Sequence, residues 1–179
     1  MPLPTREDLM RLPPRAIVAY AARCARRVEA TYAAAMAHRP DLVAAVDRAI
    51  SQAEQFAAHG TADVEADVAD EADSAARVAQ AAAVADAANA AARAAHAAAR
   101  AAHAAVDAAQ EISRTAHAAA FAAAFAAFAA ADVAHSAAFV RAVGQDFKRL
   151  ADLTRSGEDV AIPPDADGPL GPLWPEERA

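Results

Sequence analysis

Hydrophobic and polar positions recur at three- and four-residue steps along most of the chain, which is the spacing of an amphipathic helix. No segment shows strict alternation of apolar and polar residues, so a sheet is not expected. The pattern predicts an all-α fold. We expect an antiparallel helical bundle with long alanine-rich helices over residues 1–157, followed by an extended Pro/Gly-rich C-terminal tail over 158–179.

The start of the chain carries helix signals. Thr5 with Asp8 resembles a capping box, which predicts a short helical turn over 6–12. Pro13 and Pro14 end that turn, and Pro14 suits the first position of a helix that includes 16–36. The four arginines between 15 and 27 lie mainly off its apolar stripe, which comprises Ile17, Ala21, Cys24, Val28 and Tyr32.

A second amphipathic helix begins at Pro40, and Gly60 is a stop signal for it. Its apolar face comprises Leu42, Val43, Val46, Ile50, Ala53 and Phe56. The loop between the two helices, near 38–40, is short. The helices should therefore form an antiparallel hairpin.

Residues 61–143 contain neither Gly nor Pro. As one helix they would extend about 125 Å, too long for so few large apolar residues to stabilise. We expect breaks near Asp70–Ser74 and Gln110–Thr115. The strongest core signal follows, a stripe formed by Phe121, Phe125, Phe128, His135 and Phe139 and continued by Val143, Phe147 and Leu150, in a helix that ends near Arg155–Gly157.

The tail is rich in proline and glycine, so it should be neither helix nor sheet. Leu170, Leu173 and Trp174 are too apolar for a plain linker. We expect them to dock on the bundle. The alternative is a short motif offered to a partner.

Charge is unevenly distributed around a net charge of −7. Residues 49–92 carry eight acids against one Arg, and 156–179 carry six acids against one Arg. This balance argues against nucleic acid and would attract a basic protein. With one cysteine, no apolar leader and no long apolar run, we expect a cytoplasmic protein outside the membrane.

The sequence gives only weak indications of catalytic or metal-binding residues. His96, His103 and His117 lie on one helical line, but a seven-residue step separates neighbouring rings by about 10 Å, too far to share a metal ion. Cys24 sits on an apolar stripe, where a free cysteine acts as a small hydrophobe. No phosphate loop or catalytic motif occurs. We therefore expect no enzyme activity, no metal and no cofactor.

One dense acidic run stands out as a candidate partner-binding surface. The structural interpretation, which assigns it no function, is a solvated region near a helix N-terminus, where the helix dipole favours negative charge. The functional interpretation is a docking patch for a basic protein, made of Asp63, Glu65, Asp67, Asp70, Glu71 and Asp73.

Three sequence segments carry a family resemblance: AIVAYAARCARRVEATY (16–32), RPDLVAAVDRAISQAEQFAAHG (39–60) and HAAARAAHAA (96–105). They resemble alanine-rich, all-helical bacterial immunity proteins of polymorphic toxin systems. The similarity covers residues 14–140, and its most distinctive part is Cys-Ala-Arg-Arg-Val at 24–28. The tail and the Phe-Ala helix are closer to other alanine-rich bacterial proteins.

The resemblance implies a non-catalytic protein that neutralises a cognate, basic toxin domain by occluding it. It supplies no catalytic residues. The alternative is a structural protein that forms homo-oligomers through its alanine and phenylalanine seams.

Overall fold

The computed structural model describes residues 3–60, 137–156, 160–165 and 168–174. Within these ranges the chain is helical and contains no strand, which confirms the all-α prediction for this part. The helices are α1 (Arg6–Leu9), α2 (Pro14–Ala35), α3 (Pro40–His59) and α7 (Ala137–Leu153).

The capping box that opens α1 is present. The backbone amide of Asp8 donates to the Thr5 hydroxyl at 3.2 Å, and the amide of Thr5 donates to the Asp8 carboxylate at 3.0 Å. The Thr5 hydrogen bonds hold the pKa of Asp8 below its usual value. The helix is shorter than the predicted 6–12, because Arg11 and Leu12 bond three residues back instead of four.

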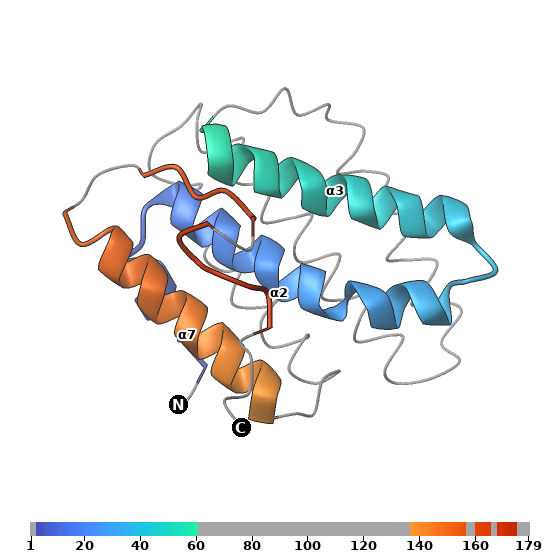
Figure 1. The fold of residues 1–179 in the computed structure, drawn as a ribbon, viewed down its shortest axis with the longest axis horizontal. Coiled ribbons are helices and arrows are strands. Elements are labelled where there is room, and N and C mark those ends of the chain that lie inside the picture. The colour runs from blue at the N-terminus through green and yellow to red at the C-terminus, as the bar shows by residue number, and fades with distance from the viewer. Residues whose placement is uncertain (1–2, 61–136, 157–159, 166–167, 175–179) are drawn as a thin grey trace.

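Helix α2 is the centre of the described fold, since it packs against both α3 and α7. A short connection after α2 lets α3 run back along it, and α7 crosses its other side (Figure 1). Gly60 ends α3 in the left-handed conformation, with φ of 74°, and its amide donates to the Phe56 carbonyl. Pro14 and Gly60 therefore mark the boundaries that the sequence predicted for them.

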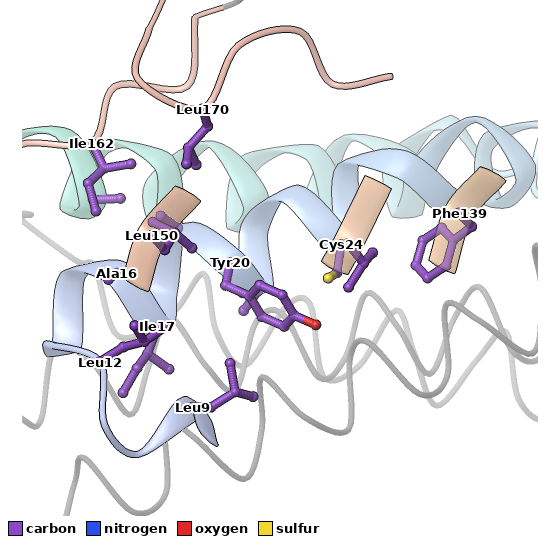
Figure 2. Packing of buried hydrophobic residues seen from close by; sticks show 14 of the residues in the cluster. Leu9, Leu12, Ala16, Ile17, Tyr20, Cys24, Phe139, Leu150, Ile162 and Leu170 are labelled. Atoms are coloured by element: carbon purple, nitrogen blue, oxygen red, sulfur yellow. The ribbon is translucent and has the colours of Figure 1, made fainter. Parts of the chain in front are cut away.

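Two apolar clusters hold these helices together. The larger joins α1, α2 and α7, where Phe139 and Leu150 of α7 face the side of α2 that carries Ile17, Tyr20 and Cys24 (Figure 2). The smaller joins α2 to α3 and comprises Val18, Ala22, Ala53 and Phe56. Most of the predicted stripe residues in these helices are buried, although Val43 and Phe147 are only partly so.

Two arginines of α2 are more buried than the sequence predicted. Every residue from 16 to 25 is buried, so α2 has no broad solvated face there. Arg23 is only 4% exposed and Arg27 only 6%. The sequence places both beside the apolar stripe but does not predict that neighbouring elements cover them.

Several predictions fall outside the described residues. These are the helix breaks near Asp70–Ser74 and Gln110–Thr115, the histidine line, the first part of the phenylalanine stripe and the acidic run. A search of the described helices finds none with the length and apolar character that a membrane span requires.

Candidate functional site

A buried ionic cluster lies where α2 and α7 meet. Asp146 of α7 is 2% exposed and accepts from two arginines of α2. Nε of Arg23 lies 2.8 Å from Oδ2 of Asp146, and Nη2 of Arg27 lies 2.7 Å from the same oxygen. Two cations thus share one anion in the interior, and further acceptors are needed to offset the loss of water.

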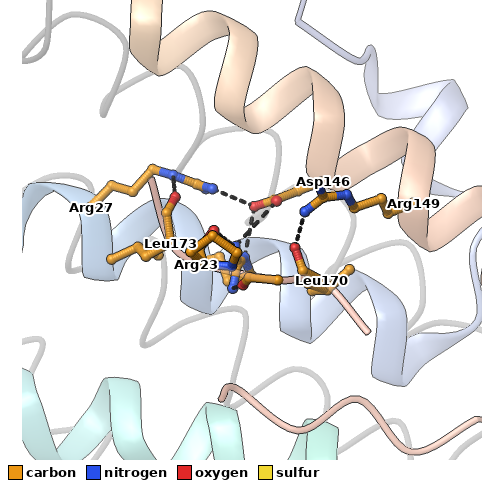
Figure 3. A network of polar contacts seen from close by, with 8 residues as sticks. Arg23, Arg27, Asp146, Arg149, Leu170 and Leu173 are labelled. Carbon is orange, nitrogen blue, oxygen red and sulfur yellow. Dashed lines mark hydrogen bonds and ion pairs between the residues drawn. The ribbon is translucent and has the colours of Figure 1, made fainter. Parts of the chain in front are cut away.

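Those acceptors come from the C-terminal segment, residues 168–174. Arg23 donates to the carbonyl of Gly171 at 3.1 Å and to that of Pro172 at 2.9 Å. Nε of Arg27 donates to the Leu173 carbonyl at 2.9 Å, and Arg149 of α7 donates to the Leu170 carbonyl. Figure 3 shows arginines from both helices directed at this segment. Four successive carbonyls are therefore held by three arginines.

Side chains of the segment complete the contact. Leu170 is buried in the larger apolar cluster. Trp174 packs edge-on against Phe139, with ring centroids 6.5 Å apart, and the guanidinium of Arg27 lies 5.7 Å from the Trp174 ring centroid. Trp174 nevertheless remains 44% exposed. The predicted docking residues thus differ in environment, because Leu170 lies inside and Trp174 lies at the edge.

Two polar atoms near this cluster lack partners. Nη1 of Arg27 and the hydroxyl of Tyr20 are buried and donate to no acceptor among the described residues. Burial raises the pKa of Tyr20 well above its usual value. An orphan donor on a buried guanidinium is costly. The unpartnered N–H of Arg27 can therefore donate to one further oxygen atom.

Cys24 lies on α2 between Tyr20 and the arginines. Its side chain is fully buried, and this burial raises the pKa of the thiol to about 12, although nearby Arg27 opposes the shift. The thiol is therefore protonated at neutral pH and is a poor nucleophile. These surroundings match the small-hydrophobe interpretation of Cys24.

A second ionic group connects α2 to α3. Arg26 lies 2.7 Å from Glu54, 2.6 Å from Asp47 and 2.8 Å from Glu29. Burial alone would lower the pKa of Arg26, but hydrogen bonds to these carboxylates, led by Glu54, raise it above its ordinary value. The group links the two arms of the hairpin and leaves Arg26 occupied by structural partners.

Arg15 closes the end of α3. Its guanidinium donates to the Ala57 carbonyl at 3.1 and 3.2 Å and to the Ala58 carbonyl at 2.7 Å. The amide of Ile162 also donates to the Ala57 carbonyl, at 2.9 Å. Carbonyls in the last turn of a helix lack intrahelical partners, and a cation there also complements the helix dipole. Two distant parts of the chain therefore meet at this helix end.

The predicted acidic patch, Asp63 to Asp73, lies outside the described residues. Sequence reasoning missed the Arg23–Arg27–Asp146 cluster. One signal for it was available, because Asp146 lies three residues after Val143 and four before Leu150, on an apolar stripe. A carboxylate at such a position requires a buried partner. Nothing in the sequence indicated which cation that partner is.

Comparisons with known protein families, with curated proteins and with solved structures return no match to this chain. In the part of the chain that the structure describes, no three His, Cys, Asp or Glu side chains are grouped closely enough to hold a metal ion.

Proposed function

We propose that the chain is a non-catalytic protein-binding module, acting in the cytoplasm as an immunity-type protein that occludes a basic toxin domain. The observation that carries protein binding is the placement of Trp174. This half-exposed ring is held between Arg27 and Phe139, and the backbone before it is fixed by three arginines. Trp and Arg are enriched among residues that dominate protein interfaces, and a ring already fixed in place loses little entropy on binding.

The toxin-directed part of the proposal rests on the sequence. Residues 49–92 carry a strong excess of acids, and the run from Asp63 to Asp73 is its densest part. A basic toxin domain would be attracted to this charge, and the attraction would speed its association. The resemblance of residues 14–140 to immunity proteins points to the same kind of partner.

We further propose that the described helices belong to one antiparallel bundle spanning residues 1–157, and that residues 158–179 form an extended tail on it. The hairpin of α2 and α3, with α7 across α2, supports this arrangement. The carbonyl contacts of residues 170–173 support the position of the tail.

The proposal predicts that a toxin-like reading frame lies next to the gene, and co-expression with its product tests the proposal. We expect the chain to restore growth and to co-purify with that product. Trp174→Ala should weaken the complex at least about tenfold, as expected for a dominant interface residue. Met10→Ala is a matched control, since Met10 is also a large exposed apolar residue but lies outside the Trp174 contacts. The absence of both complex and rescue would reject the immunity role.

A second arm of the experiment separates the charge contribution. Neutralising Asp63, Glu65, Asp67, Asp70, Glu71 and Asp73 together should slow association and reduce its dependence on salt, because long-range attraction is screened by ions. An unchanged association rate would remove the acidic run from the interface. It would leave the Trp174 contribution to be judged separately.

A further inference from the structure

The guanidinium groups of Arg23, Arg27 and Arg149, here called the arginine face, contact a peptide mainly through its backbone. The peptide is the chain's own segment 168–174, in which the sequence Gly-Pro-Leu occurs twice in succession before Trp174. Every hydrogen bond from this face to the segment ends on a main-chain carbonyl. The polar part of such recognition depends on the course of the backbone, and the burial of Leu170 adds a requirement for an apolar side chain.

The chemistry of the two sides is complementary. Arginine has only donors, five N–H groups and no acceptor. Proline lacks a backbone N–H, so Pro169 and Pro172 leave the segment rich in acceptors and poor in donors. A segment with a free N–H at these positions would bring extra donors toward a face that has few acceptors to offer.

The spacing also matches. Arg23 and Arg27 are four residues apart on α2, an axial step of about 6 Å. Residues 168–171 form a turn closed by a hydrogen bond from the Gly171 amide to the Gly168 carbonyl, and the next carbonyls follow α2. Arg23 bonds the carbonyls of Gly171 and Pro172, and Arg27 bonds that of Leu173, so the segment advances by about one to two residues for each helical turn. Ala19, one turn before Arg23, lines a small cavity together with Leu170.

We propose that the arginine face is a peptide-binding site for a Gly-Pro-Leu type segment of a second protein, and that residues 168–174 occupy it as an intramolecular ligand. Because Trp174 belongs to the resident segment, occupation of this site by a second protein and toxin binding through the fixed Trp174 ring exclude one another. The unpartnered Nη1 of Arg27 favours a different protein over a second copy. A second copy offers only the same acceptors, whereas another segment can add an oxygen that the resident one lacks.

Leaving the site empty is unfavourable. Without the segment, Arg23 and Arg27 would retain one shared carboxylate, that of Asp146, and would lose three carbonyl acceptors. Water replaces these acceptors when the segment leaves, so release loses protein hydrogen bonds and apolar contacts that another segment with the same acceptor pattern would restore.

The test uses the full chain and a dye-labelled synthetic peptide with the sequence of residues 168–174. Leu170→Asp displaces the resident segment, because its carboxylate cannot enter the apolar cluster. We expect this variant to bind the peptide, with a red shift of Trp174 emission marking release of the resident segment. Wild type should bind it at least about tenfold more weakly, since a tethered competitor acts at an effective concentration of order millimolar.

Matched variants check which face is used. Adding Arg149→Gln to Leu170→Asp should weaken peptide binding several-fold, whereas adding Arg155→Gln should not, because Arg155 pairs with Asp152 on the exposed side. A peptide with Asp at the first leucine should not bind.

If Leu170→Asp loses its helical circular dichroism, Gly171→Ala replaces it as the variant that displaces the resident segment. Gly171 has φ of 68°, and an added Cβ would lie 3.0 Å from Nη1 of Arg149.

A folded variant with exposed Trp174 that fails to bind the peptide at millimolar concentration would overturn the proposal. Concentration-dependent dimers of wild type in sedimentation, abolished by Leu170→Asp, would also overturn it, because they would assign the site to a second copy. Toxin binding by wild type and by Trp174→Ala is measured independently of peptide binding, so the two proposals fail separately.

Discussion

At the scale of single residues, Asp146 is the one carboxylate that is buried among the described residues. It is the carboxylate that Arg23 and Arg27 share, and all three side chains are almost completely buried. Buried ion pairs add little net stability relative to apolar packing, yet removing one partner is strongly destabilising. The importance of Asp146 therefore shows when it is removed.

Asp146→Asn should lower the free energy of unfolding by about 3–5 kcal/mol, because it leaves two buried arginines without a counter-charge. Urea unfolding followed by circular dichroism measures this. Asp152→Asn on the same helix is the control, since Asp152 and Arg155 form an exposed pair and such pairs contribute at most about 1 kcal/mol. Equal effects of the two substitutions would show that Asp146 is not a buried counter-ion.

Cys24 gives the fold a dependence on alkaline pH. Its pKa is about 12 in the folded chain and about 8.5 when unfolded. Below the unfolded pKa the thiol is protonated in both states, so it does not change the free energy of unfolding with pH. As pH rises from there toward 12, only the unfolded chain loses the proton, and the free energy of unfolding falls by up to about 1.4 kcal/mol per pH unit. Cys24→Ala should lose this contribution. Cys24 contributes to the raised pKa of Tyr20, so both proteins carry Tyr20→Phe in this comparison, and the difference between their unfolding curves then isolates Cys24.

If the curves with and without Cys24→Ala run parallel from neutral to alkaline pH, the thiol is accessible and titrates normally. Such a result would contradict its placement in the core.

At the scale of elements, local signals predicted the described helices well. The Thr5–Asp8 capping box, Pro14 and Gly60 all lie at helix boundaries, because each acts through its own backbone conformation or hydrogen bonds to near neighbours. The extent of α1 was overestimated, because its tightened last turn brings Leu9 and Leu12 together into the core. That outcome depends on packing, which a local pattern does not contain.

Gly60→Ala tests the end of α3. The left-handed backbone at this position disfavours a Cβ, and the added atom would lie 3.2 Å from Nη1 of Arg15. We expect a loss of at least about 1 kcal/mol in the free energy of unfolding. Gly60→Asn should cost less, because asparagine tolerates this conformation. Equal losses for both would assign the effect to crowding of Arg15 and not to the backbone.

At the scale of the whole molecule, the candidate site was beyond the reach of the sequence. Arg23, Asp146 and Gly171 are separated by more than a hundred residues and then by twenty-five, and no periodicity connects them. The sequence did indicate that Leu170 needed burial. It did not indicate that arginines would hold the carbonyls around it, because backbone acceptors are identical at every position.

The single tryptophan makes the state of the C-terminal segment measurable. We expect Trp174 fluorescence and helical circular dichroism to change at the same urea concentration, because the buried arginines tie the segment to α2 and α7. An earlier fluorescence transition would show that residues 168–174 detach while the helices stay folded. Arg149→Gln should move the fluorescence transition to lower urea more than the helical one.

The carbonyl contacts of Arg23 and Arg27 also set an order of events during synthesis. A ribosome releases the N-terminus first, so α2 emerges long before Asp146 and the carbonyls of Gly171 to Leu173. Until then its two inner arginines have none of their native acceptors, and burying them would be unfavourable. The central helix of the fold is therefore made early and can pack completely only after residue 173 has left the ribosome.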